Sequence, residues 1–365
     1  MSYVDTLDAY LRWRGSVTLS YASLTEADVI ALTLLAYINF ENIVPEDGRR
    51  ITIQEAAKAF AGLKGTPQAD SSLACAVRIL GELADTVRFR YLELSHYRHV
   101  VDESVPIQYG ALQIHISPFT SLIAFRGTDD DLVGWKENLF MCSRLPYAGQ
   151  ARAVEYLNEV MGGSPFWRRF LVTGHSKGGS VAKYAAIYCE PRFQKRIKRV
   201  ISLDGPGFYR DISGEEAFLG IADRMVNLMP EESLVGVLLR HPEACEIVKS
   251  YDKGVQQHSP DNWKLQGDGS LVRGTRRTDL SYTIEATIDR WVAGIELEER
   301  ERFIEVFFDV VQKAGIHTYT ELTELSLRKV GSILKAMSHI SSEDKSMILN
   351  VFKLLLQAYG RSRSN

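Results

Sequence analysis

The chain contains 365 residues, of which 45% are hydrophobic and 24% are charged. These proportions are typical of a globular protein, and the length suffices for one large domain or two ordinary ones with a full core. The formal net charge of −3 implies no overall electrostatic attraction to nucleic acid or to an anionic membrane, and we expect no nucleic acid partner.

The N-terminus and the cysteines indicate the compartment. A secretory signal peptide requires an apolar stretch, which here is interrupted by the charged residues Asp5, Asp8, Arg12 and Arg14. The chain has four cysteines, Cys75, Cys142, Cys189 and Cys245, and no two of them form a CxxC pair. Their spacing argues against a zinc site or a disulfide framework. We therefore expect reduced thiols in a cytoplasmic protein.

Residues 1–85 have the patterns of helices. The segment 23–40 begins with a Ser/Thr cap signal and continues into the nearly apolar run 29–40. This run is too short to cross a bilayer, so it predicts a buried helix and no transmembrane segment. Residues 51–60 and 71–84 are further helix candidates. We expect this helical region to pack on the core.

Residues 86–277 alternate between strand-like and helix-like segments. The expected strands lie at 111–117, 121–127, 169–174 and 199–205, and the expected helices at 149–163 and 180–190. Short apolar runs that end in glycine are typical of buried parallel strands. Their alternation with helices predicts an α/β fold, with a mostly parallel sheet flanked by helices.

Residues 278–365 return to helical spacing. One stripe in this region predicts core packing, with a partner or membrane surface as the alternative. It consists of Phe303, Val306, Phe307, Val310, Val311 and Ala314. No repeat or low-complexity linker separates the regions, so we expect 1–85, 86–277 and 278–365 to form one integrated domain.

The segment Gly174-His175-Ser176-Lys177-Gly178 fits the G-x-S-x-G pattern between an expected strand and an expected helix. In that context the pattern predicts a sharp turn that holds Ser176 in a strained conformation and exposes its hydroxyl. Glycine is needed on both sides because side chains at Gly174 and Gly178 would collide with neighbouring backbone. The alternative is an ordinary glycine-rich connection.

A second segment, 121–139, contains a strand that ends in Arg126-Gly127-Thr128. An elbow hydrolase takes one oxyanion donor from the loop after an earlier strand and another from the residue after the nucleophile. Thr128 and Lys177 are the candidates for these two N–H donors. The alternative for Thr128 is a simple turn before an acidic helix start.

The motifs "FRGTDDDLVGWKENL" and "GHSKGG", with "DGPGF" and "QQHSPDNW", resemble class 3 (triacylglycerol-type) lipases of the α/β-hydrolase fold. The full pattern resembles a bacterial branch of lipase-like proteins, and only that branch shares the two helical ends. The resemblance implies an α/β-hydrolase fold with helical N- and C-terminal extensions, and a serine esterase that needs no metal or organic cofactor.

Triad order in elbow hydrolases is serine, acid, histidine, which restricts the choice of base. The histidines after Ser176 are His241, His258, His317 and His339. His241 follows an apolar run and suits a helix end, and the last two lie in the helical tail. His258 lies in a polar loop before Trp263, as the catalytic histidine of the resembling lipases precedes an aromatic residue. We expect His258 to be the base.

The acid is less determined. The resembling lipases carry an aspartate at the position of Ser233, after a strand that we expect within the segment 223–236, so this chain departs from their pattern. Asp204 ends the expected strand 199–205 and is the preferred candidate. Glu232 is the alternative acid and Asp252 a remote one, while Asp204 as a turn-capping residue is the non-catalytic alternative.

These residues predict a serine hydrolase that cleaves an ester or thioester through Ser176, His258 and Asp204. Lys177 replaces the usual leucine of the lipases, which suggests a polar or anionic substrate or an ion pair with residues 129–131. The segment 129–150 and the helical ends are candidates for a lid. The alternatives are a non-catalytic binding protein of the same fold, and a peptidase or acyltransferase at the same site.

Overall fold

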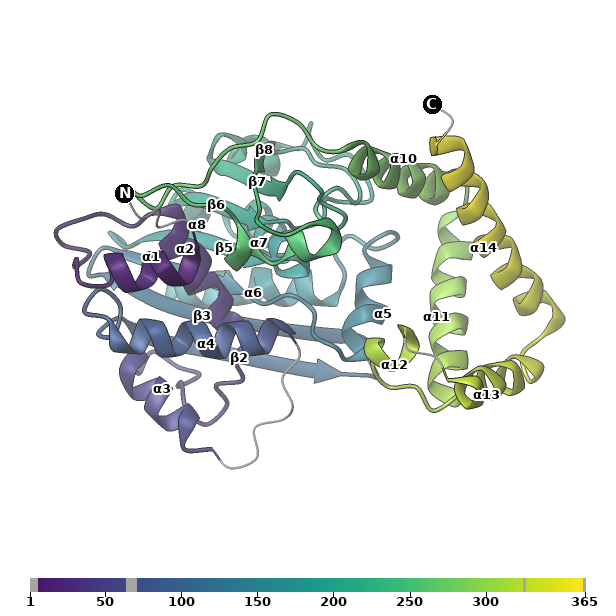
Figure 1. Ribbon diagram of the computed structural model, residues 1–365, viewed down its shortest axis with the longest axis horizontal. Helices are drawn as coiled ribbons and strands as arrows, with labels where there is room; N and C mark the ends of the chain where they lie inside the picture. The colour runs from purple at the N-terminus through teal and green to yellow at the C-terminus, as the bar shows by residue number, and fades with distance from the viewer. Residues whose placement is uncertain (1–5, 64–70, 324–325, 364–365) are drawn as a thin grey trace.

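A single sheet of eight strands organises the chain, and the computed structural model describes residues 6–63, 71–323 and 326–363 (Figure 1). The strands lie side by side in chain order: β1 (Ile51–Thr52), β2 (Glu93–Asp102), β3 (Ile107–Ser117), β4 (Thr120–Phe125), β5 (Arg169–His175), β6 (Ile197–Leu203), β7 (Met225–Pro230) and β8 (Ala244–Val248). The pairs from β1 to β4 are antiparallel, and those from β4 to β8 are parallel.

The N-terminal helices cover one face of this sheet (Figure 1). They are α1 (Leu7–Arg14), α2 (Glu26–Leu34), the 3₁₀ turn η1 (Leu35–Tyr37), α3 (Ile53–Ala61) and α4 (Ser71–Asp85). Thr25 and Asp28 form a capping box that begins α2. Leu122 and Ala124 of β4 pack into the same core cluster as Ile30. Residues 29–37 are buried throughout, as the apolar run predicts.

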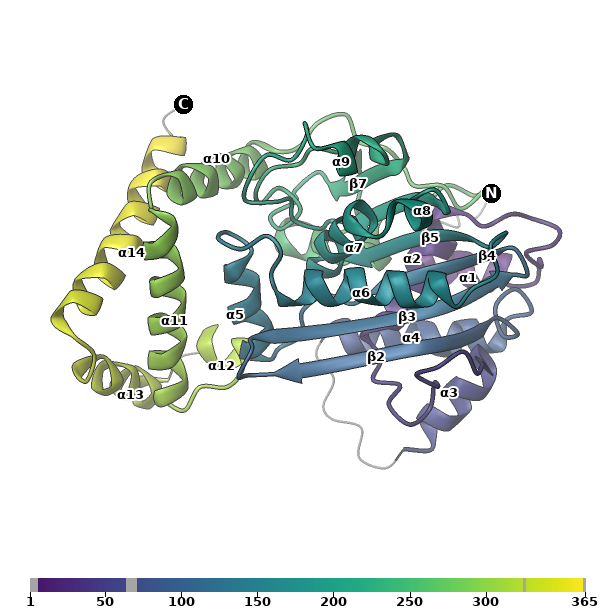
Figure 2. The same cartoon turned by 180° about the vertical axis from the view of Figure 1, so that it is seen from behind.

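Helices α6 and α7 cover the opposite face (Figure 2). The helices on this side are α6 (Ala148–Gly162), α7 (Lys177–Tyr188), α8 (Pro191–Gln194) and α9 (Glu216–Leu219), with η2 (Ala222–Arg224) nearby. Ile123 and Phe125 of β4 pack in this second cluster with Leu157 and Ala185. Successive residues of a strand point to opposite faces, so β4 contributes to both cores.

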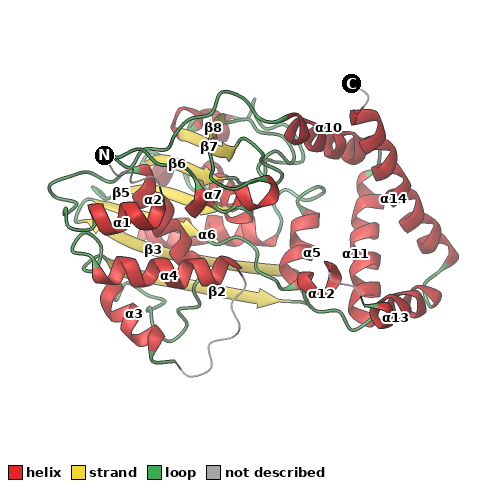
Figure 3. Cartoon of the chain, in the orientation of Figure 1, coloured by secondary structure: helices red, strands yellow, loops and turns green. Residues whose placement is uncertain are grey.

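The C-terminal helices project beyond the end of the sheet where α5 lies (Figure 3). The C-terminal helices are α10 (Asp279–Ala293), α11 (Leu297–Lys313), α12 (Tyr319–Thr323), α13 (Leu327–Ser338) and α14 (Ser342–Arg363), and α5 spans Leu132–Phe140. Phe303 and Val311 of the α11 stripe are buried with Leu132 and Phe140 of α5, so this stripe packs in a core. None of the helices in the described ranges has the length and apolar character to cross a membrane.

The expected strands from 111 to 205 correspond to parts of β3, β4, β5 and β6, and the expected helices between them to parts of α6 and α7. The sequence analysis missed β1, β2 and β8. A mixed, mostly parallel sheet with helices on both faces and a sharp β5–α7 turn makes this an α/β-hydrolase fold, as predicted.

Candidate active site

Ser176 occupies the turn between β5 and α7. Its backbone has φ 58° and ψ −131°, a combination that residues other than glycine rarely adopt and that stores strain. The turn sits at the carboxyl end of a central parallel strand, where open α/β sheets place their ligand crevices. The Ser176 side chain lines a cavity of about 600 Å³ there.

Two glycines make this turn possible. A Cβ on Gly174 would lie 2.0 Å from the carbonyl oxygen of Gly178, and a Cβ on Gly178 would lie 2.3 Å from the carbonyl oxygen of Phe125 in β4. Both contacts are with backbone atoms, which cannot move aside as a flexible side chain can. A side chain at either position would therefore force the strand, the helix and the neighbouring strand apart.

Asp204 directly follows β6, and its carboxylate is completely buried. Its Oδ2 lies 2.6 Å from Nδ1 of His258, and its Oδ1 accepts a hydrogen bond of 2.5 Å from the Ser233 hydroxyl. A carboxylate only accepts, so the His258 proton lies on Nδ1 and Nε2 keeps a free electron pair. Ser233, at which the resemblance to the lipases implied an aspartate, thus donates to the aspartate that follows the adjacent strand.

The loop that carries His258 is a 3₁₀ turn, η3 (Gly254–His258), followed by a second, η4 (Pro260–Asn262). Glu232 makes two hydrogen bonds with this loop. Its carboxylate accepts from the N–H of Gly254, and its own N–H donates to Gln257 Oε1 at 2.9 Å. The indole of Trp263 is buried and donates to the carbonyl of Gln257 at 2.8 Å. The structure thus places Glu232 on the loop backbone, and Asp204 on the imidazole.

His175 is a site residue that the sequence analysis did not consider. Its Nε2 lies 2.8 Å from the carbonyl oxygen of His258, and its Nδ1 lies 2.7 Å from the Tyr37 hydroxyl of η1. A carbonyl only accepts, so Nε2 carries the proton and Nδ1 accepts from Tyr37. Burial lowers the pKa of His175 well below 6.5, and His258 acts in the same direction. A neutral His175 therefore connects the N-terminal helices to the His258 loop.

Lys177 begins α7 and lines the cavity, but it is buried, and its ammonium contacts residues outside the cavity lining. The ammonium donates to Glu137 Oε2 at 2.6 Å and to the carbonyl of Gln108 at 2.7 Å. Burial lowers the pKa of Lys177, and the Glu137 carboxylate acts in the opposite direction. The expected ion pair with residues 129–131 is wrong, because Asp129 pairs with Arg126 at 2.5 Å. A buried, neutralised ammonium also removes the reason to expect an anionic substrate.

Thr128 follows β4 in the loop before α5, and it lines the same cavity as Ser176, Lys177 and His258. Its hydroxyl donates to Asn138 Oδ1 at 2.9 Å, which fixes this loop to α5. The first N–H groups of a helix have no partner within the helix, and the helix dipole favours negative charge beside them. The N–H of Lys177, the first residue of α7, is such a group.

The walls of the cavity come from α5, α10 and α12 as well as from the hydrolase core. Its apolar lining includes Leu139, Met141, Val235, Leu238, Leu239, Val255, Ile288, Trp291 and Val292. Thr320 of α12 donates from its N–H and its hydroxyl to Asp130 Oδ1, at 2.8 and 2.9 Å. The rings of Tyr319 and Trp135 stack 4.1 Å apart. The C-terminal helices are therefore bound directly to the Thr128 loop.

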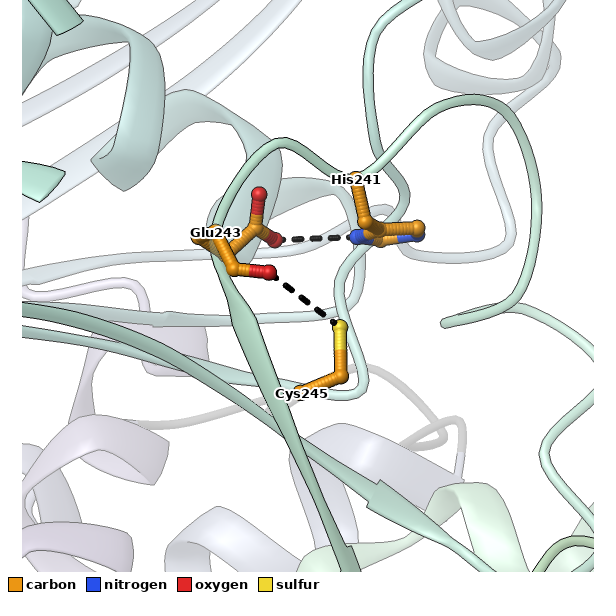
Figure 4. Close-up of side chains that lie close together, drawn as sticks. All are labelled: His241, Glu243 and Cys245. Carbon is orange, nitrogen blue, oxygen red and sulfur yellow. Dashed lines mark hydrogen bonds and ion pairs between the residues drawn. The ribbon is translucent and has the colours of Figure 1, made fainter. Parts of the chain in front are cut away.

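Figure 4 shows a second cluster of polar side chains, none of which is among the residues that line this cavity. His241 Nδ1 lies 2.9 Å from Glu243 Oε1, and the Sγ of Cys245 contacts the carbonyl of Glu243. The three side chains have metal-binding chemistry, but the fully buried ammonium of Lys183 lies 2.6 Å from the same oxygen of Glu243. Burial would raise the pKa of Glu243, but Lys183 and His241 lower it to about 2. Lys183 and Glu243 therefore form a buried ion pair, in which the ammonium already balances the charge that a metal ion would balance.

The expected position of His241 at a helix end is wrong, because His241 lies in the loop that leads into β8. Its neighbours are Lys183 and Glu243 rather than the carbonyl end of a helix. His317 precedes α12, and its carbonyl accepts from the N–H of Leu132 at 3.2 Å. Of these histidines, only His258 lines the cavity with Ser176.

Three comparisons with known proteins bear on this site. A family model described as Mbeg1-like matches residues 83–309, which is more than half of the chain. Among solved structures, a crystal structure of M37 lipase is 16% identical, with a TM-score of 0.37 over 59% of this chain and 69% of that chain. A search of curated proteins found no match.

Proposed function

Because the chain belongs to the Mbeg1-like family and carries a serine elbow beside a histidine–aspartate pair, we propose that it is a serine hydrolase of carboxylic esters or thioesters. The observation that carries the proposal is the 2.6 Å contact between His258 Nδ1 and Asp204 Oδ2, on a histidine that lines one cavity with Ser176. Three sequence-distant segments converge there, as nucleophilic catalysis requires.

In the proposed reaction His258 Nε2 takes the proton of the Ser176 hydroxyl as its oxygen attacks the acyl carbon. The resulting imidazolium keeps its Nδ1 proton on Asp204, whose charge stabilises it. His258 then gives the Ser176 proton to the departing alcohol or thiol, which leaves an acyl-enzyme. Water then gives a proton to His258 Nε2 as its oxygen bonds to the acyl carbon. The bond between that carbon and the Ser176 oxygen breaks, His258 returns the proton to Ser176, and the carboxylic acid leaves.

The negative charge on the acyl oxygen requires donors that are in place before the reaction. We assign this role to the backbone N–H groups of Thr128 and Lys177. Each such donor contributes roughly 10²–10³ in rate. The ion pair with Glu137 and the hydrogen bond with Asn138 hold the two residues still, so these donors need no reorganisation.

The walls of the cavity favour an acyl group with an apolar chain. Leu139, Met141, Ile288, Trp291 and Val292 supply hydrocarbon and aromatic surface, and the charges of Lys177 and Asp129 are used within the protein. A volume of about 600 Å³ lies within the range of ligand pockets in proteins. We therefore propose an uncharged ester or thioester of an aliphatic acid as the substrate class.

The absence of an acid at the lipase position favoured a non-catalytic binding protein as the alternative. The contact of Asp204 with both Ser233 and His258 weakens that reason. Hydrolysis of a short p-nitrophenyl ester by the wild type and by Ser176→Ala tests the proposal. We expect the variant to lose at least about 10³-fold in kcat. Equal rates for the two folded proteins would refute it.

A further inference from the structure

Helix α14 carries an exposed apolar stripe. Leu349 is 64% exposed, Phe352 43% and Leu356 73%, at a spacing of i, i+3 and i+7, which places three side chains on one face of a helix. Val351 and Ala358 of the same helix are buried. Phe352 marks the border of the stripe, because its ring also packs against Phe303 of α11. In Figures 1 and 2, α14 forms the outer edge of the C-terminal helices.

Cations accompany this stripe. Lys353 is exposed and lies four residues after Leu349 and three before Leu356, so it shares their face. In the sequence, residues 345–365 contain four basic residues and no acidic residue. A single-sign charge next to exposed aliphatic side chains is uncommon on a protein surface that only contacts water, where both signs are usually interspersed.

Helix α13 has the same character. Val330 is 38% exposed and Leu334, one turn later, is 62% exposed. The exposed Lys335 follows them, and residues 326–342 contain three Lys or Arg residues and no Asp or Glu. Residues 326–365 therefore carry seven basic against two acidic residues, although the whole chain has a net charge of −3. The segment therefore has a positive net charge, although Lys329 of α13 forms an ion pair with Glu321 at 3.1 Å.

An exposed apolar stripe can bind a second copy of the chain or a lipid surface, and the positive charge beside this stripe distinguishes the two. In a symmetric dimer through this face, the cations of one copy would lie opposite the same cations of the other, and they would repel. A helix with apolar side chains and cations on its exposed side instead suits a surface of anionic lipid, where the hydrocarbon enters the headgroup region and the ammonium groups meet phosphate. We propose that the α14 stripe (Leu349, Phe352, Lys353 and Leu356) binds anionic lipid membranes.

The position of the stripe connects it to the cavity. Trp291 of α10 lines the cavity, and its indole N–H donates to the carbonyl of Val351 in α14 at 3.1 Å. Val351 belongs to the buried side of the helix whose other side carries the stripe. Arg290 of α10 also donates to the Ser362 hydroxyl of α14 at 2.8 Å. The proposed lipid-binding surface and the cavity wall are thus joined through the packing of α10 against α14 and two hydrogen bonds between these helices.

Vesicle co-sedimentation tests this proposal without any hydrolysis. The full chain, as the Ser176→Ala variant to keep the lipid intact, is mixed with vesicles of phosphatidylcholine alone or of phosphatidylcholine with phosphatidylglycerol. Two further variants are made in this Ser176→Ala parent. One combines Leu349→Ser with Leu356→Ser, and the other carries Lys353→Glu. The control is Leu219→Ser in α9, which is 63% exposed and closely matches Leu349. Circular dichroism verifies that each variant is folded.

We expect binding to the anionic vesicles, weakened by salt, and little binding to phosphatidylcholine alone. The double leucine variant and Lys353→Glu should each bind roughly tenfold more weakly or worse, and Leu219→Ser should bind like its parent. Equal binding to both vesicle types, no binding to either, or full binding by the double variant would overturn the proposal. So would a dimer, seen by sedimentation velocity, that the leucine substitutions dissociate. None of these outcomes depends on whether Ser176 is a nucleophile.

Discussion

The Ser233 hydroxyl donates a 2.5 Å hydrogen bond to Asp204 Oδ1, and the other oxygen of that carboxylate contacts His258. Asp204 directly follows β6, and Ser233 lies in the segment that follows the neighbouring strand β7, at the same end of the sheet. The carboxylate that contacts the histidine therefore comes from the residue after β6, and the hydroxyl that hydrogen-bonds to it comes from the segment after β7. In the proposed mechanism the acid therefore comes from the segment after β6 rather than from the segment after β7.

Asp204→Asn tests this assignment of the acid. An amide in this position cannot stabilise an imidazolium and favours the wrong tautomer, so we expect kcat on a p-nitrophenyl ester to fall by about 10³–10⁴-fold. Glu232→Gln is the matched control, because its carboxylate accepts a hydrogen bond from the backbone of the His258 loop and not from the imidazole, and it should retain most of the activity. A larger loss for Glu232→Gln than for Asp204→Asn would assign the acid to Glu232.

Ser233→Ala measures what the supporting hydroxyl contributes. The buried carboxylate loses one of its hydrogen bonds, which costs about 1–3 kcal/mol in stability, and its orientation becomes less restricted. We expect a moderate decrease of kcat, roughly tenfold, with little change in KM. Thermal unfolding and steady-state kinetics check both effects. An unchanged kcat would show that Ser233 does not orient Asp204 during the reaction.

His175 predicts a particular dependence of stability on pH. Its pKa in the folded protein lies well below the ordinary value of 6.5, so below pH 6.5 the unfolded chain binds a proton that the folded chain does not. Stability is then lost as pH falls, by up to about 1.4 kcal/mol per pH unit from this residue. Urea unfolding of His175→Gln should show a shallower decrease between neutral and mildly acidic pH. The exposed His339→Gln serves as the control and should follow the wild-type slope.

Lys177→Leu should destabilise the protein without changing its substrate preference. The substitution leaves the buried Glu137 carboxylate without its cation, which costs about 3–5 kcal/mol. The double variant Lys177→Leu with Glu137→Gln should recover part of this loss. The ratio of kcat/KM between a neutral and an anionic ester should stay constant, because the ammonium does not reach the cavity. A changed ratio would show that Lys177 contacts the substrate.

Ile288→Trp tests the proposed acyl site. The side chain of Ile288 lines the cavity from α10, and a larger ring would fill space that a long aliphatic chain needs. We expect kcat/KM for an octanoyl ester to fall roughly tenfold relative to that for an acetyl ester. A loss by the same factor for both esters would place the acyl chain elsewhere.

Local patterns predicted the parts of the site that depend on short segments. Ser176 and its two glycines form a turn whose steric requirements are visible within five residues, and the strand and helix on either side have clear periodicity. Asp204 was preferred because it ends a strand that runs parallel to the one before Ser176. The order of the triad in the chain restricted the histidine, and the loop composition then favoured His258.

Contacts between segments that are far apart in the sequence could not be predicted from such local patterns. Glu137 lies forty residues before Lys177, and only the packing of α5 against α7 and β3 shows that it neutralises the ammonium. The link from Tyr37 through His175 to the His258 loop joins three separate regions. Strand β2 was missed because only some of its residues are buried, and because its pairing with β3 shifts register between Ser95 and Arg98, which breaks the regular alternation of buried and exposed residues.

The central claim is that the hydroxyl of residue 176 is an activated nucleophile, and covalent labelling tests it most directly. The folded wild type is incubated with a fluorophosphonate probe, and the modified peptide is identified by mass spectrometry. We predict one phosphonylated site at Ser176, no labelling of Ser176→Ala, and much slower labelling of Asp204→Asn. A folded wild type that stays unlabelled, or a label that persists at another residue in Ser176→Ala, would contradict the proposed mechanism.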